Sequence, residues 1–169
     1  MSTSVDVADW IRKIADDERT RDAARIMDDE RAAQKADVVR RHGRQLIDDL
    51  RAAVTRDVGA FRHEFPGDRA RDVVVDTAVP NGGFVVRKPA PAGASLTVTP
   101  NLETATMVCD FRFTPTNALP PREDRIHVTF NGDGGETLRM KHLGTGQLFA
   151  TADALSEYLL VPVLTGRPR

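Results

Sequence analysis

The sequence predicts an α+β protein, in which a long N-terminal helix is followed by an antiparallel sheet and a closing helix. Three observations indicate this class. Residues 6–62 contain no proline and only two glycines, Gly43 and Gly59, in an otherwise helix-favouring composition. All ten prolines and ten of the twelve glycines come later in the chain. From residue 72 onward, apolar and polar residues alternate, which is the period of a half-buried strand.

The composition is that of a globular protein and argues against several functions. A chain of 169 residues with 40% hydrophobic and 29% charged residues suits one domain, with or without an extension. A net charge of −1 gives no general attraction to nucleic acid or to an acidic membrane surface. No apolar run has the length of a signal peptide or a membrane span. Because the single cysteine, Cys109, cannot form an internal disulfide, we expect a cytoplasmic protein without a membrane partner.

The first turns of the long helix form a short apolar face. Asp6 is placed to cap the helix, because its carboxylate can accept hydrogen bonds from the first free amides. The apolar side chains that follow share one side of the helix, and they are Val7, Trp10, Ile11 and Ile14. We expect this face to associate with a second copy of the chain or with another protein.

The next part of the helix is mostly charged. Acidic and basic residues lie three apart, as in Asp16 and Arg19. Each such pair adds about 0.2–0.5 kcal/mol to an isolated helix, so this part can persist with little packing. The pattern leaves open whether the helix is continuous or bends at residues 16–20. Residues 1–37 are therefore interpreted as a charged helical extension.

From residue 38 the apolar stripe returns and is broader. Ile47, Val54 and Phe61 recur at a spacing of seven, and Leu50 lies between them. Such a face is wide enough to pack against a sheet. Residues 38–164 are therefore predicted to form the α+β domain, and residues 165–169 a loose tail.

About six strands are predicted in this domain, joined as an antiparallel meander. The connections carry turn residues, as in residues 81–83 and 131–135. The clearest alternation, in residues 104–114, directs one set of side chains to the buried face: Ala105, Met107, Cys109, Phe111 and Phe113.

The chain is predicted to close with a helix on the sheet. A short extended piece at residues 148–149 precedes Thr151, which is placed to cap a helix over residues 152–161. Because both helices carry apolar faces, we expect both to cover the same apolar face of the sheet.

No catalytic, metal or nucleotide motif stands out. Acidic repeats at residues 14–19, 26–31 and 46–51 are rotated by about 120° and 200° from one another, so they share no face of the helix. The four histidines lack the spacing of zinc ligands, and each is interpreted as a surface or rim residue. The glycines in residues 132–135 precede a strand pattern, so they form a turn and no phosphate loop. We assign no catalytic, metal or cofactor-binding residue and expect no cofactor.

The polar face of the sheet is the best candidate binding surface in the domain. If the alternation holds, this face carries a largely basic set of side chains: Asp110, Arg112, Arg125, His127, Arg139 and Lys141. Such a face could bind an acidic peptide, a phosphate-bearing ligand or RNA. RNA-binding sheets, however, place aromatic residues on that face, and here the strand phenylalanines point inward. A nucleic-acid partner is therefore not expected.

Two functions follow from these patterns. The leading hypothesis is a non-enzymatic cytoplasmic module for interaction or oligomerisation, in which the helical extension mediates self-association or docking. The alternative is a small-molecule-binding α+β cone, with or without enzymatic activity, whose pocket lies between helix and sheet. This alternative is motivated by the mixture of phenylalanines with Met107, Cys109 and Met140 on the inward face.

Overall fold

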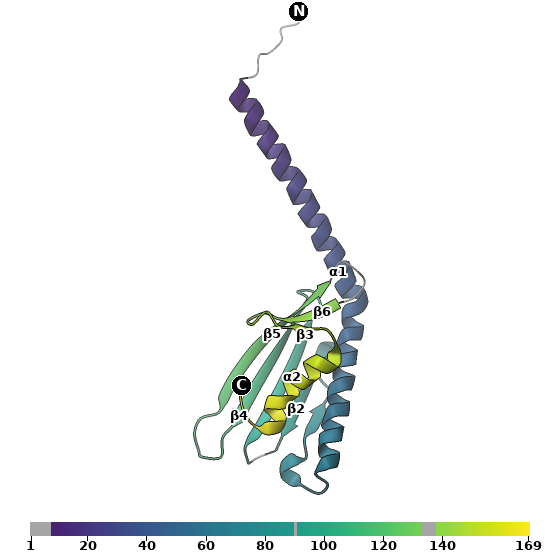
Figure 1. Cartoon of the computed structure of the whole chain (residues 1–169), viewed down its shortest axis with the longest axis vertical. Helices are drawn as coiled ribbons and strands as arrows, with labels where there is room; N and C mark the ends of the chain where they lie inside the picture. The colour runs from purple at the N-terminus through teal and green to yellow at the C-terminus, as the bar shows by residue number, and fades with distance from the viewer. Residues whose placement is uncertain (1–7, 90, 133–137) are drawn as a thin grey trace, which may run out of the picture. The chain divides into compact units, whose positions relative to one another are not determined.

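A computed structural model describes residues 8–89, 91–132 and 138–169. It confirms the predicted α+β class: a long helix, a seven-stranded antiparallel sheet and a C-terminal helix follow one another along the chain (Figure 1). The structure divides into two units, Met1–Ala36 and Asp37–Arg169.

Helix α1 spans Asp9–Glu64 and is uninterrupted at residues 16–20, where the sequence left a bend open. In the first unit, the described side chains of α1 are exposed apart from the partly exposed Ala15. Ion pairs form there at the predicted spacing of three, joining Asp16 to Arg19 at 2.8 Å and Glu18 to Arg21 at 3.1 Å. Asp6 and Val7 lie outside the described residues.

In the second unit, α1 packs through the predicted apolar stripe. Its buried residues recur every three or four positions and are Val39, Gly43, Ile47, Leu50, Ala53, Val54 and Val58. Phe61 is partly buried at the end of the stripe. The helix is therefore held here by packing, as its periodicity predicted.

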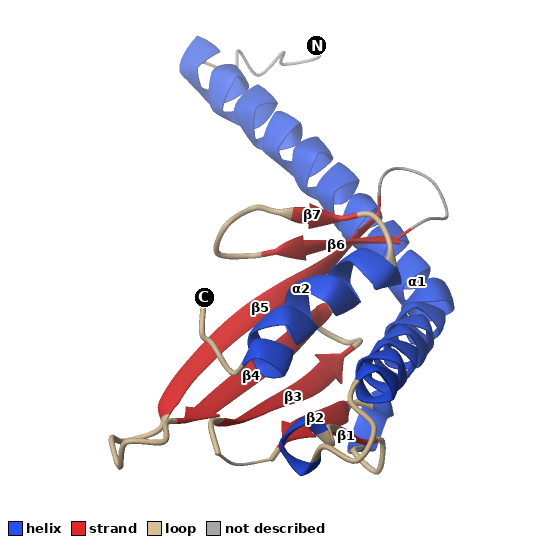
Figure 2. Ribbon diagram, turned by 60° about the horizontal axis from the view of Figure 1, so that its bottom comes forward, coloured by secondary structure: helices blue, strands red, loops and turns tan. Residues whose placement is uncertain are grey.

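The sheet is a meander in which each strand pairs with the next in the sequence, forming half of a barrel (Figure 2). Its strands are β1 (Val74–Asp76), β2 (Phe84–Lys88), β3 (Gly93–Asn101), β4 (Thr106–Thr114), β5 (Arg122–Gly132), β6 (Leu138–His142) and β7 (Leu148–Phe149). The seventh strand is the short extended piece that the sequence indicated. Two 3-10 turns, Arg69–Arg71 and Pro80–Gly82, flank β1, and the second contains the predicted turn residue Asn81 at a φ of 62°.

Helix α2 spans Ala152–Thr165 and covers the same face of the sheet as the second part of α1 (Figure 2). Thr151 caps it, since its Oγ1 accepts a hydrogen bond from the amide of Ala154 at 3.1 Å. The helix continues past Pro162 and ends at Gly166, whose φ of 67° suits glycine. It is thus longer than the sequence predicted.

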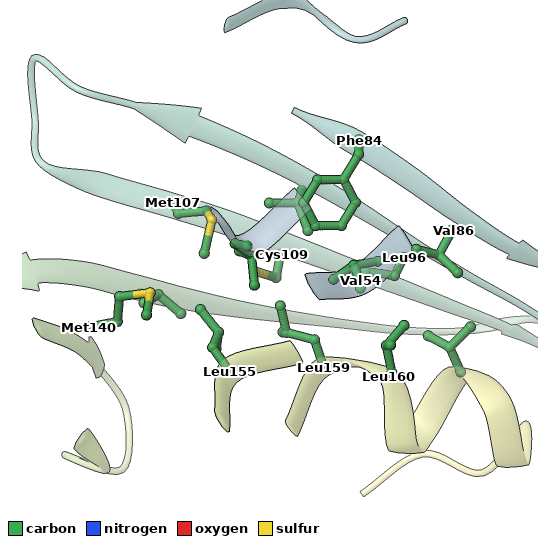
Figure 3. Close-up of a cluster of buried hydrophobic side chains, with 14 of the residues drawn as sticks. Val54, Phe84, Val86, Leu96, Met107, Cys109, Met140, Leu155, Leu159 and Leu160 are labelled. Atoms are coloured by element: carbon green, nitrogen blue, oxygen red, sulfur yellow. The ribbon is translucent and has the colours of Figure 1, made fainter. Parts of the chain in front are cut away.

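The core lies between the sheet and the two helices. Figure 3 shows side chains from the strands, such as Phe84 and Leu96, packed against Leu155 and Leu159 of α2 and Val54 of α1. Two polar contacts also join the helices: Ser156 donates to Asp57 at 2.8 Å, and Arg56 pairs with Asp153 at 2.8 Å.

Candidate functional sites

The predicted association face is exposed at the start of α1. Trp10 is 65% exposed, Ile11 43% and Ile14 52%, and we call these three residues the apolar tip. They lie at positions i, i+1 and i+4, so they share one side of the helix. Val7, the fourth predicted member, lies outside the described residues. Burying a side chain of this size removes apolar surface from water and contributes about 1.5–3 kcal/mol.

Two further apolar residues of the same unit do not extend the tip. Ile26 and Met27 are as exposed as Ile14, at 54% and 55%. Ile26 is rotated by about 60° from Ile11 but lies about 22 Å farther along the axis, and Met27 is rotated by about 220° from Ile14. The apolar tip is therefore a local feature and not part of a continuous coiled-coil seam.

The six predicted residues of the polar sheet face do share one face of the sheet. Asp110 is paired with Arg125 across β4 and β5, and Lys141 with Thr129 across β5 and β6. Paired residues of antiparallel strands point to the same side, and alternate residues along a strand repeat that side. The other three residues therefore share this face: Arg112, His127 and Arg139. The strand phenylalanines are buried on the opposite face, as predicted.

This face has mixed charge, because neighbouring carboxylates pair with two of its arginines. The Nε of Arg125 donates to Asp110 at 2.6 Å, and this hydrogen bond raises the pKa of Arg125. Arg112 pairs with Glu123 at 3.2 Å. The positive potential expected from the sequence is therefore reduced over β4 and β5.

The inward-facing residues on which the small-molecule-binding hypothesis was based lie in the packed core. Met107, Cys109 and Met140 are at most 1% exposed. Burial, together with the charge of Asp110, raises the pKa of the Cys109 thiol, so this thiol stays protonated and unreactive.

A crevice of about 280 Å³ lies farther along the sheet, between α2 and the inner face of β4 to β6. Its main lining residues are Phe111, Phe113, Ile126, His142, Tyr158 and Arg169. The rings of Phe111 and Phe113 are parallel, with an interplanar angle of 2° and centroids 6.1 Å apart. Sequence reasoning found neither this crevice nor its residues as a group.

His142 is the polar residue inside this crevice. It was interpreted from the sequence as a surface or rim residue, and that interpretation is wrong, because its side chain is only 7% exposed. Its position two residues after Met140 directs it to the inner face, beneath α2. The aromatic ring of Tyr158 packs edge-on against it, with centroids 6.0 Å apart.

The hydrogen bonds of His142 fix its tautomer. Its Nδ1 accepts from the backbone amides of Gly144 at 3.0 Å and Thr145 at 3.1 Å. The neutral imidazole therefore carries its proton on Nε2. Within the described residues, Nε2 has no hydrogen-bond partner. Every fully buried side-chain nitrogen or oxygen among these residues does have a partner, so Nε2 is in contact with solvent. The Nε2–H group is thus an accessible donor.

The side chain of Arg169 is held at the crevice because Pro162 leaves a carbonyl of α2 without its hydrogen-bond donor. Proline has no N–H, so the carbonyl of Tyr158, four residues earlier, lacks its helical donor. The guanidinium of Arg169 donates to this carbonyl at 2.8 Å and lies over the Tyr158 ring, with Cζ 3.9 Å from the centroid. Among the residues that the structure describes, no carboxylate pairs with the guanidinium of Arg169, while its backbone oxygen accepts from Arg122 at 3.3 Å.

Comparisons with protein-family models, with curated proteins and with solved structures found no match. In the described part of the chain, no three histidine, cysteine or acidic residues gather closely enough to hold a metal ion. Within the same residues, neither helix has an apolar stretch that could cross a membrane.

Proposed function

We propose that this protein is a non-enzymatic interaction module that self-associates through the apolar tip of α1. One observation carries the proposal: Trp10, Ile11 and Ile14 share one exposed face of a helix whose neighbouring turns are stabilised by their own ion pairs. Such a helix can persist with little packing, so its apolar residues are available for a partner. Tryptophan is also among the residues that contribute most to protein interfaces.

A second copy of the chain suits this tip because the helix can meet itself without strong repulsion. Residues 9–36 contain eight acidic and seven basic residues, interspersed along the helix. Two copies therefore bring opposite charges together in many registers, in either orientation.

The association is expected to be weak and dependent on concentration. Three side chains bury far less area than the standard interface of about 1,600 Å², so a dissociation constant in the micromolar range or above follows. We place the association in the cytoplasm, where the buried thiol of Cys109 stays reduced. In this proposal the mixed-charge sheet face is a second surface for a partner.

The test uses the single tryptophan of the chain, which lies in the tip. Sedimentation velocity and Trp10 fluorescence are measured over the same concentration series of the full chain. We expect the average mass to rise with concentration and the Trp10 emission to shift to shorter wavelength in parallel, because the indole leaves water.

A matched pair of variants ties this behaviour to the tip. Ile14→Glu places a charge on the tip face and is expected to keep the chain monomeric. Met27→Glu makes the same kind of change at a residue of similar exposure on another side of the helix, and it is expected to leave association unchanged. A wild-type chain that stays monomeric with a water-exposed indole, or equal loss in both variants, contradicts the proposal.

A further inference from the structure

We propose that the crevice between α2 and strands β4 to β6 binds a small molecule with an apolar, preferably aromatic, body and one carboxylate. The inference is independent of the self-association proposed above, because every residue that lines the crevice belongs to the unit Asp37–Arg169.

The apolar part of the ligand follows from the walls of the crevice. The parallel rings of Phe111 and Phe113 are joined by Ile126 and the ring of Tyr158. Aromatic faces and edges of this kind favour a flat apolar partner. A volume of about 280 Å³ equals that of about nine water molecules at roughly 30 Å³ each, which is enough for one aromatic ring with a short substituent.

The polar part of the ligand follows from two donors that contact the same ring. His142 lies at an edge contact with Tyr158 and offers its Nε2–H, while the guanidinium of Arg169 lies over the face of that ring. One is a neutral donor and the other a cation, so together they match a group that accepts hydrogen bonds and carries negative charge.

The charge balance of the crevice favours a single negative charge. Asp124 and Arg125 also line it, but Asp124 pairs with Arg122 at 3.4 Å and Arg125 with Asp110 at 2.6 Å. Among the described lining residues, the guanidinium of Arg169 is therefore the cation with which no side-chain carboxylate pairs. A monoanion such as a carboxylate is neutralised by one guanidinium, whereas a phosphate dianion needs further cations.

The test is a titration of the full-length protein with phenylacetate, followed by the backbone amide signals in NMR spectra. We expect saturable shifts at Gly144 and Thr145, because their amides donate to His142. The neutral analogue 2-phenylethanol has the same aromatic body without the carboxylate. We expect it to bind about tenfold more weakly, since it loses the charge-assisted hydrogen bonds.

Two substitutions on β5 locate the binding site. Ile126→Trp fills the crevice and is expected to weaken phenylacetate binding by more than about tenfold, as steric exclusion requires. His127→Trp introduces the same side chain one residue later, on the opposite exposed face of the sheet, and is expected to bind phenylacetate like the wild type.

A third substitution tests the donor without filling the crevice. In His142→Asn the shorter side chain can accept from the amides of Gly144 and Thr145 in place of Nδ1, but it has no group at the position of Nε2. We expect phenylacetate to bind about three- to tenfold more weakly and 2-phenylethanol to change less. Absence of saturable binding, equal affinity for the alcohol, or unweakened binding by a folded Ile126→Trp variant overturns the proposal.

Discussion

Residues 9–36 and residues 37–64 belong to the same helix but are stabilised by different interactions. In the first part, side chains pair along the helix itself, and the large apolar residues are exposed. In the second part, a stripe from Val39 to Val58 is buried against the sheet and α2. Helical hydrogen bonding is common to both, so the contrast lies wholly in the side chains. A helix that packs against its own chain buries its apolar face, whereas a helix stabilised by ion pairs along its own length can leave its apolar side chains exposed.

The largest expected effect that separates the two parts comes from removing a large apolar side chain. Leu50 is 1% exposed, so Leu50→Ala is expected to reduce the free energy of unfolding by about 2–5 kcal/mol. Ile14→Ala changes an exposed residue and is expected to alter it by less than about 0.5 kcal/mol. Urea unfolding followed by circular dichroism measures both, under conditions where the chain is monomeric. Similar losses in the two variants would show that the halves are not stabilised differently.

Gly43 and Gly59, both in the second part of the helix, allow a packed position to be compared with an open one. A Cβ added at Gly59 would have no atom within 4 Å, so Gly59→Ala is expected to stabilise the protein by about 0.5–1 kcal/mol. A Cβ added at Gly43 would lie 2.7 Å from Cδ2 of Leu102, and that side chain would have to move. We expect Gly43→Ala to be less stable than Gly59→Ala by about 1 kcal/mol. Thermal unfolding of the two variants checks this, and equal stability would contradict the close approach to Leu102.

Hydrogen exchange of backbone amides compares the two parts within one molecule. Amides in residues 16–25 are expected to exchange through local opening, and those in residues 47–58 only through opening of the whole domain. Raising the salt concentration to about 1 M screens exposed ion pairs. It is therefore expected to lower protection about twofold in residues 16–25, as a loss of about 0.2–0.5 kcal/mol implies. Protection that is equal in the two segments at low salt would argue that the first part is also packed.

The smallest expected effect is a pH dependence where the two parts meet. A hydrogen bond from Arg41 lowers the pKa of Asp37 below its ordinary value of 3.8. Because the folded pKa is the lower one, the contribution to stability is present above pH 3.8 and is lost as the pH falls below it. Asp37→Asn should therefore be slightly less stable than the wild type at pH 7, and this difference should shrink in strong acid. The urea unfolding midpoints of both proteins at pH 7 and in strong acid measure this difference in stability. A difference that grows in acid would contradict the pairing of Asp37 with Arg41.

The fold could be predicted because its signals are local. The absence of proline before Pro66 and the alternation within β4 each specify one element, and short turns between strands favour a meander. The alternation in residues 125–130 predicts a strand there, whereas β5 begins at Arg122, because its first residues are polar on both faces and carry no alternation. Strand β7 has only two residues, which is too short for any period to be recognised.

The crevice could not be predicted as a unit because it depends on contacts between distant segments. The alternation of β6 did hold a signal: Leu138, Met140 and His142 lie two apart, which directs the histidine inward. Pro162 held another, since a proline inside a helix leaves a carbonyl without its donor. Nothing in the sequence, however, shows that Arg169 supplies that donor, because the contact depends on the path of the chain after α2.

The sheet ends on two very short strands, and this affects how copies of the chain can meet at high concentration. The outermost strands of the sheet are β1, with three residues, and β7, with two. A long unpaired edge would offer a row of free amides and carbonyls to which another sheet could add, and repeated addition leads to aggregation. Edges this short offer few such groups. The two outermost strands therefore give little to which a second sheet could add, whereas residues 122–126 of β5 have no strand partner on the side of β6.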